Sequence, residues 1–373
     1  MPKHIKICYI LPEYNENTDS HFFHIYELLE ELSSPSAGKA RKIDIFLIVE
    51  KANTKNIKIS KKIYIQKFRF LPLRFLESFF AALKARLSGY KIFYTHYCYI
   101  GGINAAIISR LSGGKSYYWN CAMNWLFKQK KLSGLAFLLC LRLSHFLVTG
   151  GEIMKRGYVE HYRLKPDRVK IMPNWINLDR FKSQKSQPKA GPPRAEKLKT
   201  LLFVHWLSKR KGADMIVPLA NQLSKILNTK YKILVVGDGP YKEKLLEEIN
   251  ENKLGEFVKV IGSVPNKNLI DYYAQADVFI MPSMEEGFPR VLLEAMACGI
   301  PYVASDVGAV REMSSETAQR FLVKSGDAEM FARKIESLLS DKKLYDSFKK
   351  EELEKAKEYS MENVINKFIG LFS

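Results

Sequence analysis

Short apolar runs alternate with helical patterns along the first half of the chain. Between the runs, apolar residues recur at helical spacing, as in residues 21–32 and 103–111. Runs of strand length separated by helices are typical of a mostly parallel sheet that is wrapped by helices. The runs that we interpret as strands span residues 5–11, 43–49, 63–70, 92–95, 117–119 and 146–149.

A polar segment with several prolines interrupts this alternation, and it indicates a linker or an exposed loop. The alternation then restarts. We expect strands at residues 200–204, 231–236, 258–261, 278–281, 302–304 and 320–323, with helices at 214–227, 241–252, 268–275, 290–297 and 328–339.

The whole pattern predicts an α/β protein with two doubly wound domains. We expect the first domain at residues 1–182, the linker at 183–197 and the second domain at 198–359. Residues 360–373 open with a serine that can cap a helix, and apolar residues recur behind it at helical spacing. This last segment is expected to dock on a surface.

Composition and hydropathy support a folded protein that works inside the cell. The 373 residues are 47% apolar and 12% aromatic, which suffices for two cores and excludes a disordered chain. No signal peptide is expected, because the apolar run at 5–11 is short and polar residues follow it at once. The longest apolar stretch, 132–150, contains Arg142 and His145, so we expect no spanning helix. We expect a cytoplasmic protein, either free or bound peripherally at the inner face of the membrane.

Cysteine and histidine positions give no metal or disulfide pattern. His21 and His24 could share a helix face, but no third ligand stands at helical spacing. The five cysteines are scattered, and we interpret most of them as buried small hydrophobic residues: Cys8, Cys98, Cys121, Cys140 and Cys298.

Positive charge is concentrated in the first half. Residues 1–186 hold 31 Lys and Arg against 13 Asp and Glu, whereas residues 187–373 hold 28 against 26. Such a surface either serves solubility or faces an anionic partner, of which we favour a membrane surface or lipid phosphate over nucleic acid. The segment 67–87 is basic, aromatic and amphipathic, and a second basic group lies at 128–131. We expect the apolar face of 67–87 to pack on its own sheet, with its basic residues free to face lipid.

Two glutamates eight residues apart, Glu286 and Glu294, form the most informative motif. The run before them, 276–283, is typical of a buried strand, and a helix is expected to begin at the proline that follows. One carboxylate therefore lies in the loop at the carboxyl end of a strand, where open α/β sheets bind ligands. Carboxylates can hold hydroxyl groups, while the N–H groups of Gly287 and Phe288 can hold phosphate. Hydroxyls plus phosphate describe a nucleotide sugar.

Loops after other expected strands contribute to the same edge of the sheet. Gly237 and Gly239 follow one strand and permit close backbone approach, although the third glycine of a dinucleotide fingerprint is missing. Another strand-to-helix turn lies at 305–312. Three cations that could neutralise a diphosphate follow the strand at 200–204: Lys209, Arg210 and Lys211.

In this order and spacing, the second half resembles the donor domain of retaining, two-Rossmann-domain (GT-B) glycosyltransferases of family 4, or glycosyl transferases group 1. The resemblance covers residues 200–340 and also the segment 173–181 before the linker. It implies two Rossmann-like domains facing a central cleft, the first binding the acceptor and the second the donor, with 360–373 crossing back to the first. Members of this group build lipopolysaccharide, capsule and glycolipids.

The resemblance also implies an activity and residue roles. It implies a hexosyl- or glycosyltransferase that retains the anomeric configuration and requires no metal or cofactor beyond the nucleotide-diphosphate sugar; the sequence lacks an Asp-x-Asp motif. Glu286 would contact the transferred sugar near the reacting carbon as the catalytic residue, and Glu294 would bind the ribose hydroxyls. Other donor-binding residues would be Lys209, Arg210, Lys211, Gly237, Gly239, Gly287 and Phe288.

Several positions depart from the family pattern. Trp206 stands where an arginine is usual, so either Lys209 or Arg210 would take over that phosphate contact or the donor would bind weakly. The glycine pair common after the first strand is absent from residues 12–17. His96 matches a histidine that the family often has near the acceptor, whereas Asn120 stands where another histidine is frequent. We assign His96 and Asn120 to the acceptor side.

Two other classes remain open from the sequence. One is a nucleotide-sugar epimerase of the GT-B fold, which would act without an acceptor. The other is a catalytically degenerate GT-B scaffold that binds anions through its basic half. Isomerised donor without acceptor would indicate the first, and salt-dependent anion binding without nucleotide-sugar binding would indicate the second.

Overall fold

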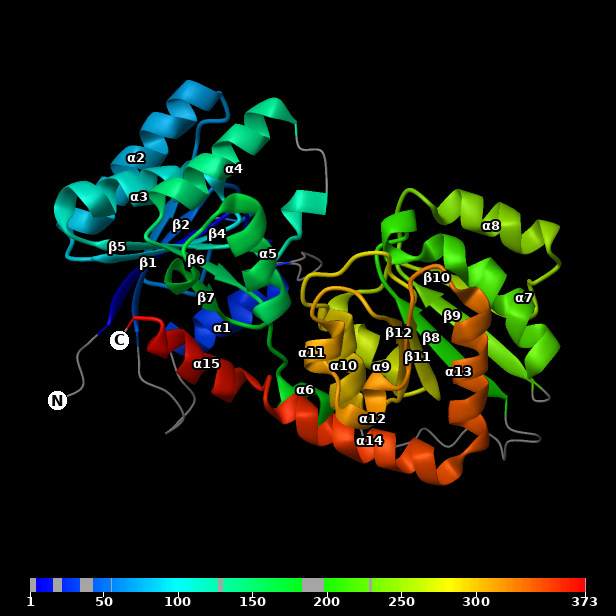
Figure 1. Ribbon diagram of the computed structural model, residues 1–373. Coiled ribbons are helices and arrows are strands. Elements are labelled where there is room, and N and C mark those ends of the chain that lie inside the picture. Colours follow the sequence, from blue (N-terminus) through cyan, green and yellow to red (C-terminus); the bar gives the residue numbers. More distant parts are fainter. Residues whose placement is uncertain are drawn as a thin grey trace. The chain divides into compact units, whose positions relative to one another are not determined.

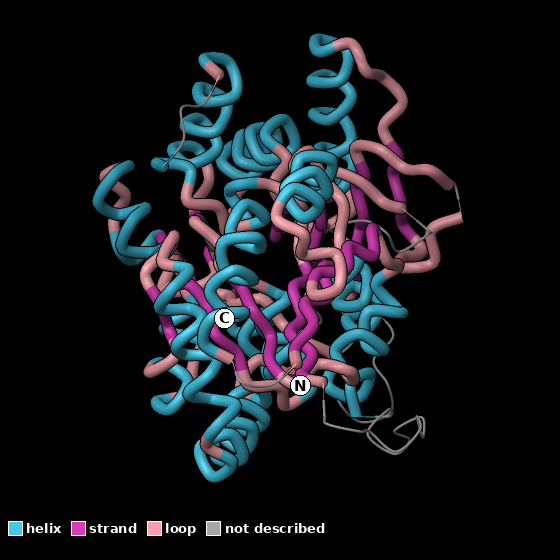
Figure 2. The backbone as a smooth tube through the Cα atoms, turned by 90° about the vertical axis from the view of Figure 1, so that its right-hand side faces the viewer, coloured by secondary structure: helices cyan, strands magenta, loops and turns pink. Residues whose placement is uncertain are grey.

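The computed structural model describes residues 5–15, 22–33, 43–54, 56–126, 130–182, 198–227 and 230–372. The chain divides into two compact units. The first comprises Met1–Pro173 together with Glu362–Ser373, and the second comprises Asn174–Met361. In each unit helices flank the strands, as Figures 1 and 2 show. The expected linker, 183–197, lies outside the described residues.

The first unit is built on a seven-stranded sheet in the order β3-β2-β1-β4-β5-β6-β7. All of its strand pairs are parallel, which is the doubly wound arrangement that the alternation predicts. The strands are β1 (Lys6–Leu11), β2 (Asp44–Val49), β3 (Lys62–Ile65), β4 (Ile92–His96), β5 (Lys115–Trp119), β6 (Phe146–Thr149) and β7 (Val169–Ile171).

Helices cover both faces of this sheet. Small residues of α2, such as Ala81 and Ala85, pack on one face together with α3. On the other face Phe368 of α15 lies 5.0 Å from the Tyr94 ring, measured between centroids. The helices of the first unit are α1 (Phe23–Ser33), α2 (Leu71–Leu87), α3 (Tyr99–Ser112), η1 (Asn124–Leu126), α4 (Lys131–Leu143), α5 (Glu152–Tyr162), η2 (Pro166–Arg168) and α15 (Met361–Gly370).

The second unit repeats the plan with six parallel strands in the order β10-β9-β8-β11-β12-β13. In both sheets the chain starts centrally, moves to one edge and then crosses to the other side, so the strand order reverses beside the first strand. The strands are β8 (Lys199–Val204), β9 (Tyr231–Val236), β10 (Val258–Gly262), β11 (Val278–Met281), β12 (Tyr302–Ser305) and β13 (Leu322–Val323).

The helices of the second unit differ from the prediction in one place near the site. The helix expected from residue 214 begins at Ile216, and Asp214 lies in a short 3-10 turn before it. Gly212 before it has φ of 77°, which turns the chain there. The helices are α6 (Leu178–Lys182), η3 (Lys209–Lys211), η4 (Ala213–Met215), α7 (Ile216–Ile226), α8 (Lys242–Glu251), η5 (Asn266–Asn268), α9 (Leu269–Tyr273), α10 (Arg290–Cys298), α11 (Val310–Met313), α12 (Glu316–Gln319), α13 (Ala328–Ser340) and α14 (Lys342–Lys357).

Two sequence-based boundaries need correction. The strand expected at 63–70 ends at Ile65, and α2 begins at Leu71. Between them the N–H groups of Lys67 and Phe68 donate to the Glu77 side chain instead of a neighbouring strand. The first domain was expected to reach residue 182, but residues from 174 onward group with the second unit. Asn174 Nδ2 donates to the Phe288 carbonyl at 2.7 Å, and this contact holds the segment there.

Candidate active site

Glu286 lies in the loop between β11 and α10 and is surrounded by hydrogen-bond donors. Its Oε2 is 2.7 Å from Lys211 Nζ, and its Oε1 is 2.9 Å from His205 Nε2 and 2.8 Å from Ser283 Oγ. The residue is 4% exposed. The loops after β8 and β11 meet because these strands are neighbours in the sheet. A buried carboxylate with three donors is held in a single orientation.

The hydrogen bonds fix the tautomer of His205. Its Nδ1 accepts from the backbone N–H of Trp206 at 3.0 Å, so the proton of the neutral ring belongs on Nε2. That Nε2–H donates to Glu286 Oε1. Because Ser283 also donates to Oε1, this oxygen is fully used, and Oε2 keeps one acceptor position for a further hydroxyl.

Glu286 is ionised over the physiological pH range. Burial by itself would raise the pKa of this carboxyl group above its ordinary value of 4.5. The His205 ring and the Lys211 ammonium outweigh burial and lower the pKa to about 2. The neighbouring Glu285 behaves differently, since burial raises its pKa against the opposing effect of Arg210 and Lys211. The site therefore contains one carboxylate that is strongly stabilised as the anion.

The three predicted cations occupy different environments. Lys211 is 7% exposed, and its Nζ also donates to the Glu285 carbonyl at 3.3 Å. Arg210 is half exposed, and its Nη1 lies 3.4 Å from Glu285 Oε2. Lys209 is exposed. The structure thus brings Lys211 into direct contact with Glu286, whereas Lys209 and Arg210 lie at the solvent-facing side of the same turn.

Glu294 lies in the second turn of α10 and is 4% exposed. Tyr273 donates its hydroxyl to Glu294 Oε2 at 2.9 Å, and Arg290 Nη2 lies 3.7 Å from Oε1. Burial and the nearby Glu294 raise the pKa of Tyr273 well above its usual value, so the phenol stays protonated as a donor. Ribose hydroxyls that bind Glu294 would share the carboxylate with these two partners.

The glycines of the β9 turn let two loops touch. Gly237 has φ of 142°, and a Cβ placed there would lie 1.9 Å from the His205 carbonyl oxygen. Gly239 has φ of 155°, and its Cβ would lie 2.4 Å from the Leu207 carbonyl oxygen. These glycines are therefore required to hold the His205 loop in place, which is a structural reason for them beside the predicted contact with donor phosphate.

The loop of Glu286 keeps its carbonyl groups inward. The Gly287 carbonyl accepts from the Ala309 N–H at 2.9 Å, and the Phe288 carbonyl accepts from Asn174. Gly308 permits this approach, because a Cβ there would lie 1.7 Å from the Glu286 carbonyl oxygen. Within the described residues, the N–H groups of Gly287 and Phe288 have no acceptor.

The two predicted acceptor-side residues lie at the carboxyl ends of adjacent strands of the first unit, since His96 is the last residue of β4 and Asn120 follows β5. His96 is 1% exposed, stacks on Trp119 with ring centroids 4.0 Å apart, and has its Nδ1 3.2 Å from the Tyr9 hydroxyl. Asn120 is 2% exposed, and its Oδ1 accepts from the Ala122 N–H at 2.9 Å. Asn120 therefore stabilises the turn after β5.

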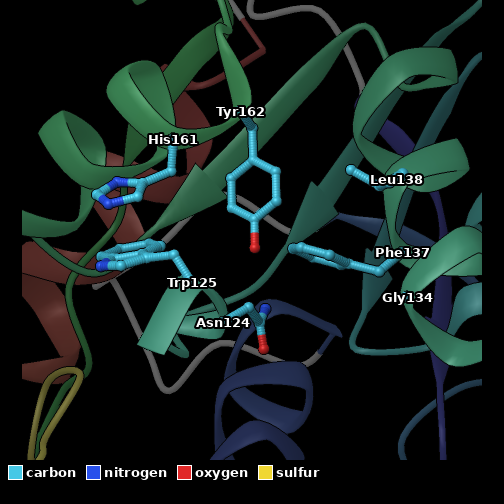
Figure 3. Close-up of a pocket in the computed structure, with 7 residues that line it drawn as sticks. All are labelled: Asn124, Trp125, Gly134, Phe137, Leu138, His161 and Tyr162. Atoms are coloured by element: carbon cyan, nitrogen blue, oxygen red, sulfur yellow. The ribbon is translucent and has the colours of Figure 1, made fainter. Parts of the chain in front are cut away.

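A cavity of about 350 Å³ lies near this turn, between η1, α4 and α5 (Figure 3). Its walls are mostly aromatic or apolar, and Trp125 stacks on His161 with centroids 5.2 Å apart. Asn124 links the cavity to the turn, because its Nδ2 donates to Asn120 Oδ1 at 3.3 Å. The cavity is lined by Asn124, Trp125, Gly134, Phe137, Leu138, His161 and Tyr162.

Sequence reasoning assigned no role to several side chains that contact the two glutamates. They come from the loops after β8 and β11 and from α9 and α10, and they are His205, Tyr273, Ser283 and Arg290. Arg290 could have been identified, since it stands four residues before Glu294 on one helix. His205 and Tyr273 gave no such signal, because their partners lie 81 and 21 residues away along the chain.

The whole chain has the fold of solved glycosyltransferases. It matches the lipopolysaccharide outer core galactosyltransferase WaaB in its apo form with a TM-score of 0.73 and 16% identity, over 99% of both chains. It matches Anabaena HepE in complex with UDP and glucose with a TM-score of 0.75 and 16% identity, also over 99% of both chains. The protein is therefore an α/β protein of the GT-B class with two Rossmann-like domains, as the sequence predicts.

The second unit carries the match to a family model. The sequence model of the family "Glycosyl transferases group 1" matches residues 184–355. This part of the chain is therefore similar to the glycosyl transferases group 1 family. Within the described residues, the helices lack the combination of length and apolar character that crossing a membrane requires.

Curated relatives share this part of the sequence. The chain is 29% identical over 198 residues to a D-inositol 3-phosphate glycosyltransferase of Geodermatophilus obscurus, covering 51% of this chain and 44% of the relative. It is 31% identical over 170 residues to the putative teichuronic acid biosynthesis glycosyltransferase TuaC of Bacillus subtilis, covering 44% and 40%. It is 30% identical over 160 residues to the phosphatidylinositol N-acetylglucosaminyltransferase gpi3 subunit of Schizosaccharomyces pombe, covering 42% and 33%. The matches span less than half the length of these relatives.

Proposed function

We propose that the protein transfers a sugar from a nucleotide-diphosphate sugar to an acceptor hydroxyl, with retention of configuration. The bond between the anomeric carbon and the diphosphate oxygen breaks, and the nucleoside diphosphate leaves with that electron pair. A bond from the acceptor oxygen to the same face of the anomeric carbon forms, and the acceptor proton passes to the departing diphosphate or to solvent. No redox step is involved.

The environment of Glu286 supports this proposal most directly. Positive charge develops on the sugar ring as the diphosphate departs, and a fixed carboxylate stabilises that charge without reorganising. Glu286 is such a group, because its pKa is about 2 and three donors hold it. The remaining acceptor position on Oε2 is available for a sugar hydroxyl.

The diphosphate is assigned to the other side of the same loop. The N–H groups of Gly287 and Phe288 lie just before α10, where a helix N-terminus favours an anion. Lys211 contacts Glu286, and we assign its ammonium group to the diphosphate as well. Lys209 and Arg210 extend the positive surface outward. With this set of donors we propose departure of the diphosphate without a metal ion. Glu294 is assigned to the ribose hydroxyls.

For the acceptor we propose a glycan or a lipid-linked glycan of a cell-surface polysaccharide or glycolipid. Two matched relatives are named for inositol phosphate or phosphatidylinositol, and a third for teichuronic acid biosynthesis. His96 and Asn120 are assigned to the first unit's side of the reaction, where both lie at the carboxyl edge of the sheet. Solved neighbours bound to UDP and UDP-glucose support UDP-sugars as the first donors to test.

The test combines a panel of UDP-, GDP- and ADP-sugars with a lipid extract, and it follows both sugar transfer and free nucleoside diphosphate. We expect one donor to be consumed by the natural chain, and Glu286→Gln to abolish this while the circular dichroism spectrum is unchanged. Glu316→Gln, at an exposed glutamate of the same unit, is the control that keeps activity. Isomerised donor without acceptor would show an epimerase instead, and no turnover with any donor would refute the proposal.

A further inference from the structure

Helix α2 of the first unit exposes a stripe of large apolar residues. Its fully buried residues are small or polar and include Ser78, Ala81 and Ala85, while Phe79 and Leu83 are partly buried against the same core. Helices that cover a sheet normally bury an apolar stripe and expose a polar one. The expectation that the apolar face of 67–87 packs on its own sheet is therefore confirmed for these inner residues, but a second apolar stripe points outward. This stripe consists of Leu73, Leu76, Phe80 and Leu87, which are 43%, 52%, 62% and 80% exposed.

Helix α4 repeats this pattern. Its outer residues Leu132, Leu135 and Leu139 are 69%, 56% and 38% exposed, and they recur at helical spacing. Phe137 and Cys140 face inward. Helix α3 lies between α2 and α4, so the three helices form one layer on the same face of the sheet (Figure 1). We call the outer surface of α2, α3 and α4 the helical face.

The stretch of chain that contains the helical face is rich in Lys and Arg, and Glu50, which lies outside this stretch and pairs with Arg74 of α2, has a buried side chain. Residues 67–151 include twelve Lys and Arg residues but one acidic residue, Glu77. Glu77 is 7% exposed, and its carboxylate accepts from the N–H groups of Lys67 and Phe68 at 2.8 and 3.0 Å. Lys84 and Arg142 continue the outer stripes of α2 and α4, and both are exposed.

We propose that the helical face binds the surface of an anionic lipid bilayer. Large apolar side chains enter the interface between headgroups and acyl chains, while lysine and arginine side chains reach the anionic headgroups. Both features of the face are then satisfied by a single partner. Two copies of this chain would bring like charges together, and a nucleic acid would leave the leucines in contact with phosphate and water.

This proposal concerns the first unit alone and does not depend on sugar transfer. Its assay is therefore sedimentation of the full chain with vesicles, in the absence of any nucleotide sugar. Vesicles of phosphatidylcholine alone are compared with vesicles that also contain phosphatidylglycerol. We expect binding to the anionic vesicles, weakened at least about tenfold by molar salt because the charges are screened, and little binding to the neutral ones.

Matched variants separate the apolar and the charged contributions. The double variant Leu76→Gln and Phe80→Gln should lower vesicle affinity by about tenfold or more, because two inserted side chains are lost. The control is Leu246→Gln on α8, an exposed leucine of the second unit, which should bind like the natural chain. Lys84→Glu should weaken binding to anionic vesicles by about tenfold, whereas Lys349→Glu on α14 should not.

These outcomes decide the proposal. Each variant is at an exposed position, and an unchanged thermal melt shows that it is folded. Absence of binding to anionic vesicles would overturn the proposal, and so would equal binding by the double variant and its control. Self-association that the double variant abolishes, measured by sedimentation velocity, would identify a second copy as the occupant. Salt-sensitive binding to RNA or DNA without vesicle binding would identify nucleic acid.

Discussion

Replacing Glu286 by glutamine should make the stability of the second unit respond differently to pH. The folded protein holds this carboxyl group at a pKa of about 2, against 4.5 for the same group in its ordinary state. A group whose pKa is lowered by folding stabilises the native state above its unfolded pKa. That stabilisation is lost as the pH falls from 4.5 towards 2.

The magnitude follows from the shift. About 2.5 pKa units at about 1.4 kcal/mol each correspond to about 3 kcal/mol of unfolding free energy that is present at pH 7. About 1 kcal/mol of this is lost by pH 4, and about 2 kcal/mol by pH 3. Glu286 is 4% exposed, so solvent screens this contribution little. The variant lacks this contribution at every pH, and it also leaves Lys211 buried without its carboxylate.

The assay is urea unfolding from pH 7 to pH 3, read by hydrogen exchange in peptides that cover β8 and β11. Such peptides report the second unit alone, which matters because two units need not unfold together. We expect the natural chain to exceed Glu286→Gln by about 3 kcal/mol at pH 7 and by progressively less below pH 4.5. A difference that stays constant over this range would refute the ion-pair reasoning, because it would show a loss of packing rather than of charge.

Three further substitutions test the neighbouring geometry. Gly308→Ala should lower the melting temperature and the activity, at a cost of about 2 kcal/mol or more, because its Cβ would lie 1.7 Å from a loop carbonyl oxygen; Gly326→Ala, also at positive φ but in open space, is the control and should cost about 1 kcal/mol. Tyr273→Phe removes the 2.9 Å hydrogen bond to Glu294 and should destabilise by about 1 to 2 kcal/mol in urea titrations, with a changed KM for the donor and little change in kcat. His205→Phe should lower kcat by about tenfold or more while KM changes little, and His205→Gln, which keeps an N–H donor, should recover part of the loss; equal kcat values for these two variants would exclude a positioning role.

The strands and their order could be predicted because both sheets are parallel and buried. Such strands are short, nearly continuous apolar runs, and the crossover rule restricts how they connect. The pair Glu286 and Glu294 could be placed for the same reason. Glu286 lies in the loop after the buried strand β11, and Glu294 lies in the helix that follows this loop, α10. The end of the expected strand at 63–70 could not be predicted, because Phe68 and Phe70 keep the alternation of apolar and polar residues going beyond Ile65.

The partners of the glutamates depend on contacts that local patterns do not contain. His205 reaches Glu286 only because β8 and β11 are neighbours in the sheet and because Gly237 allows the β9 turn to approach the His205 carbonyl. Each condition involves a different part of the chain. The sequence therefore predicts a carboxylate at the carboxyl edge of the sheet. The low pKa of Glu286 could not be predicted, because it depends on His205 and Lys211, which only the folded loops bring to it.

The exposed apolar stripe of α2 has a cause in packing. Helix α3 lies close to the sheet, where a Cβ at Gly101 would come within 2.7 Å of Ile10 and one at Gly102 within 3.1 Å of Tyr118. So close a layer leaves room on its inner side for alanine and serine, which α2 provides with Ala81 and its neighbours. Of the large apolar residues of α2, Phe79 and Leu83 are therefore only partly buried against the core, and the outer stripe stays exposed. Sequence amphipathicity shows that such a helix has two faces, but only the depth of the layer beneath it determines which face points outward.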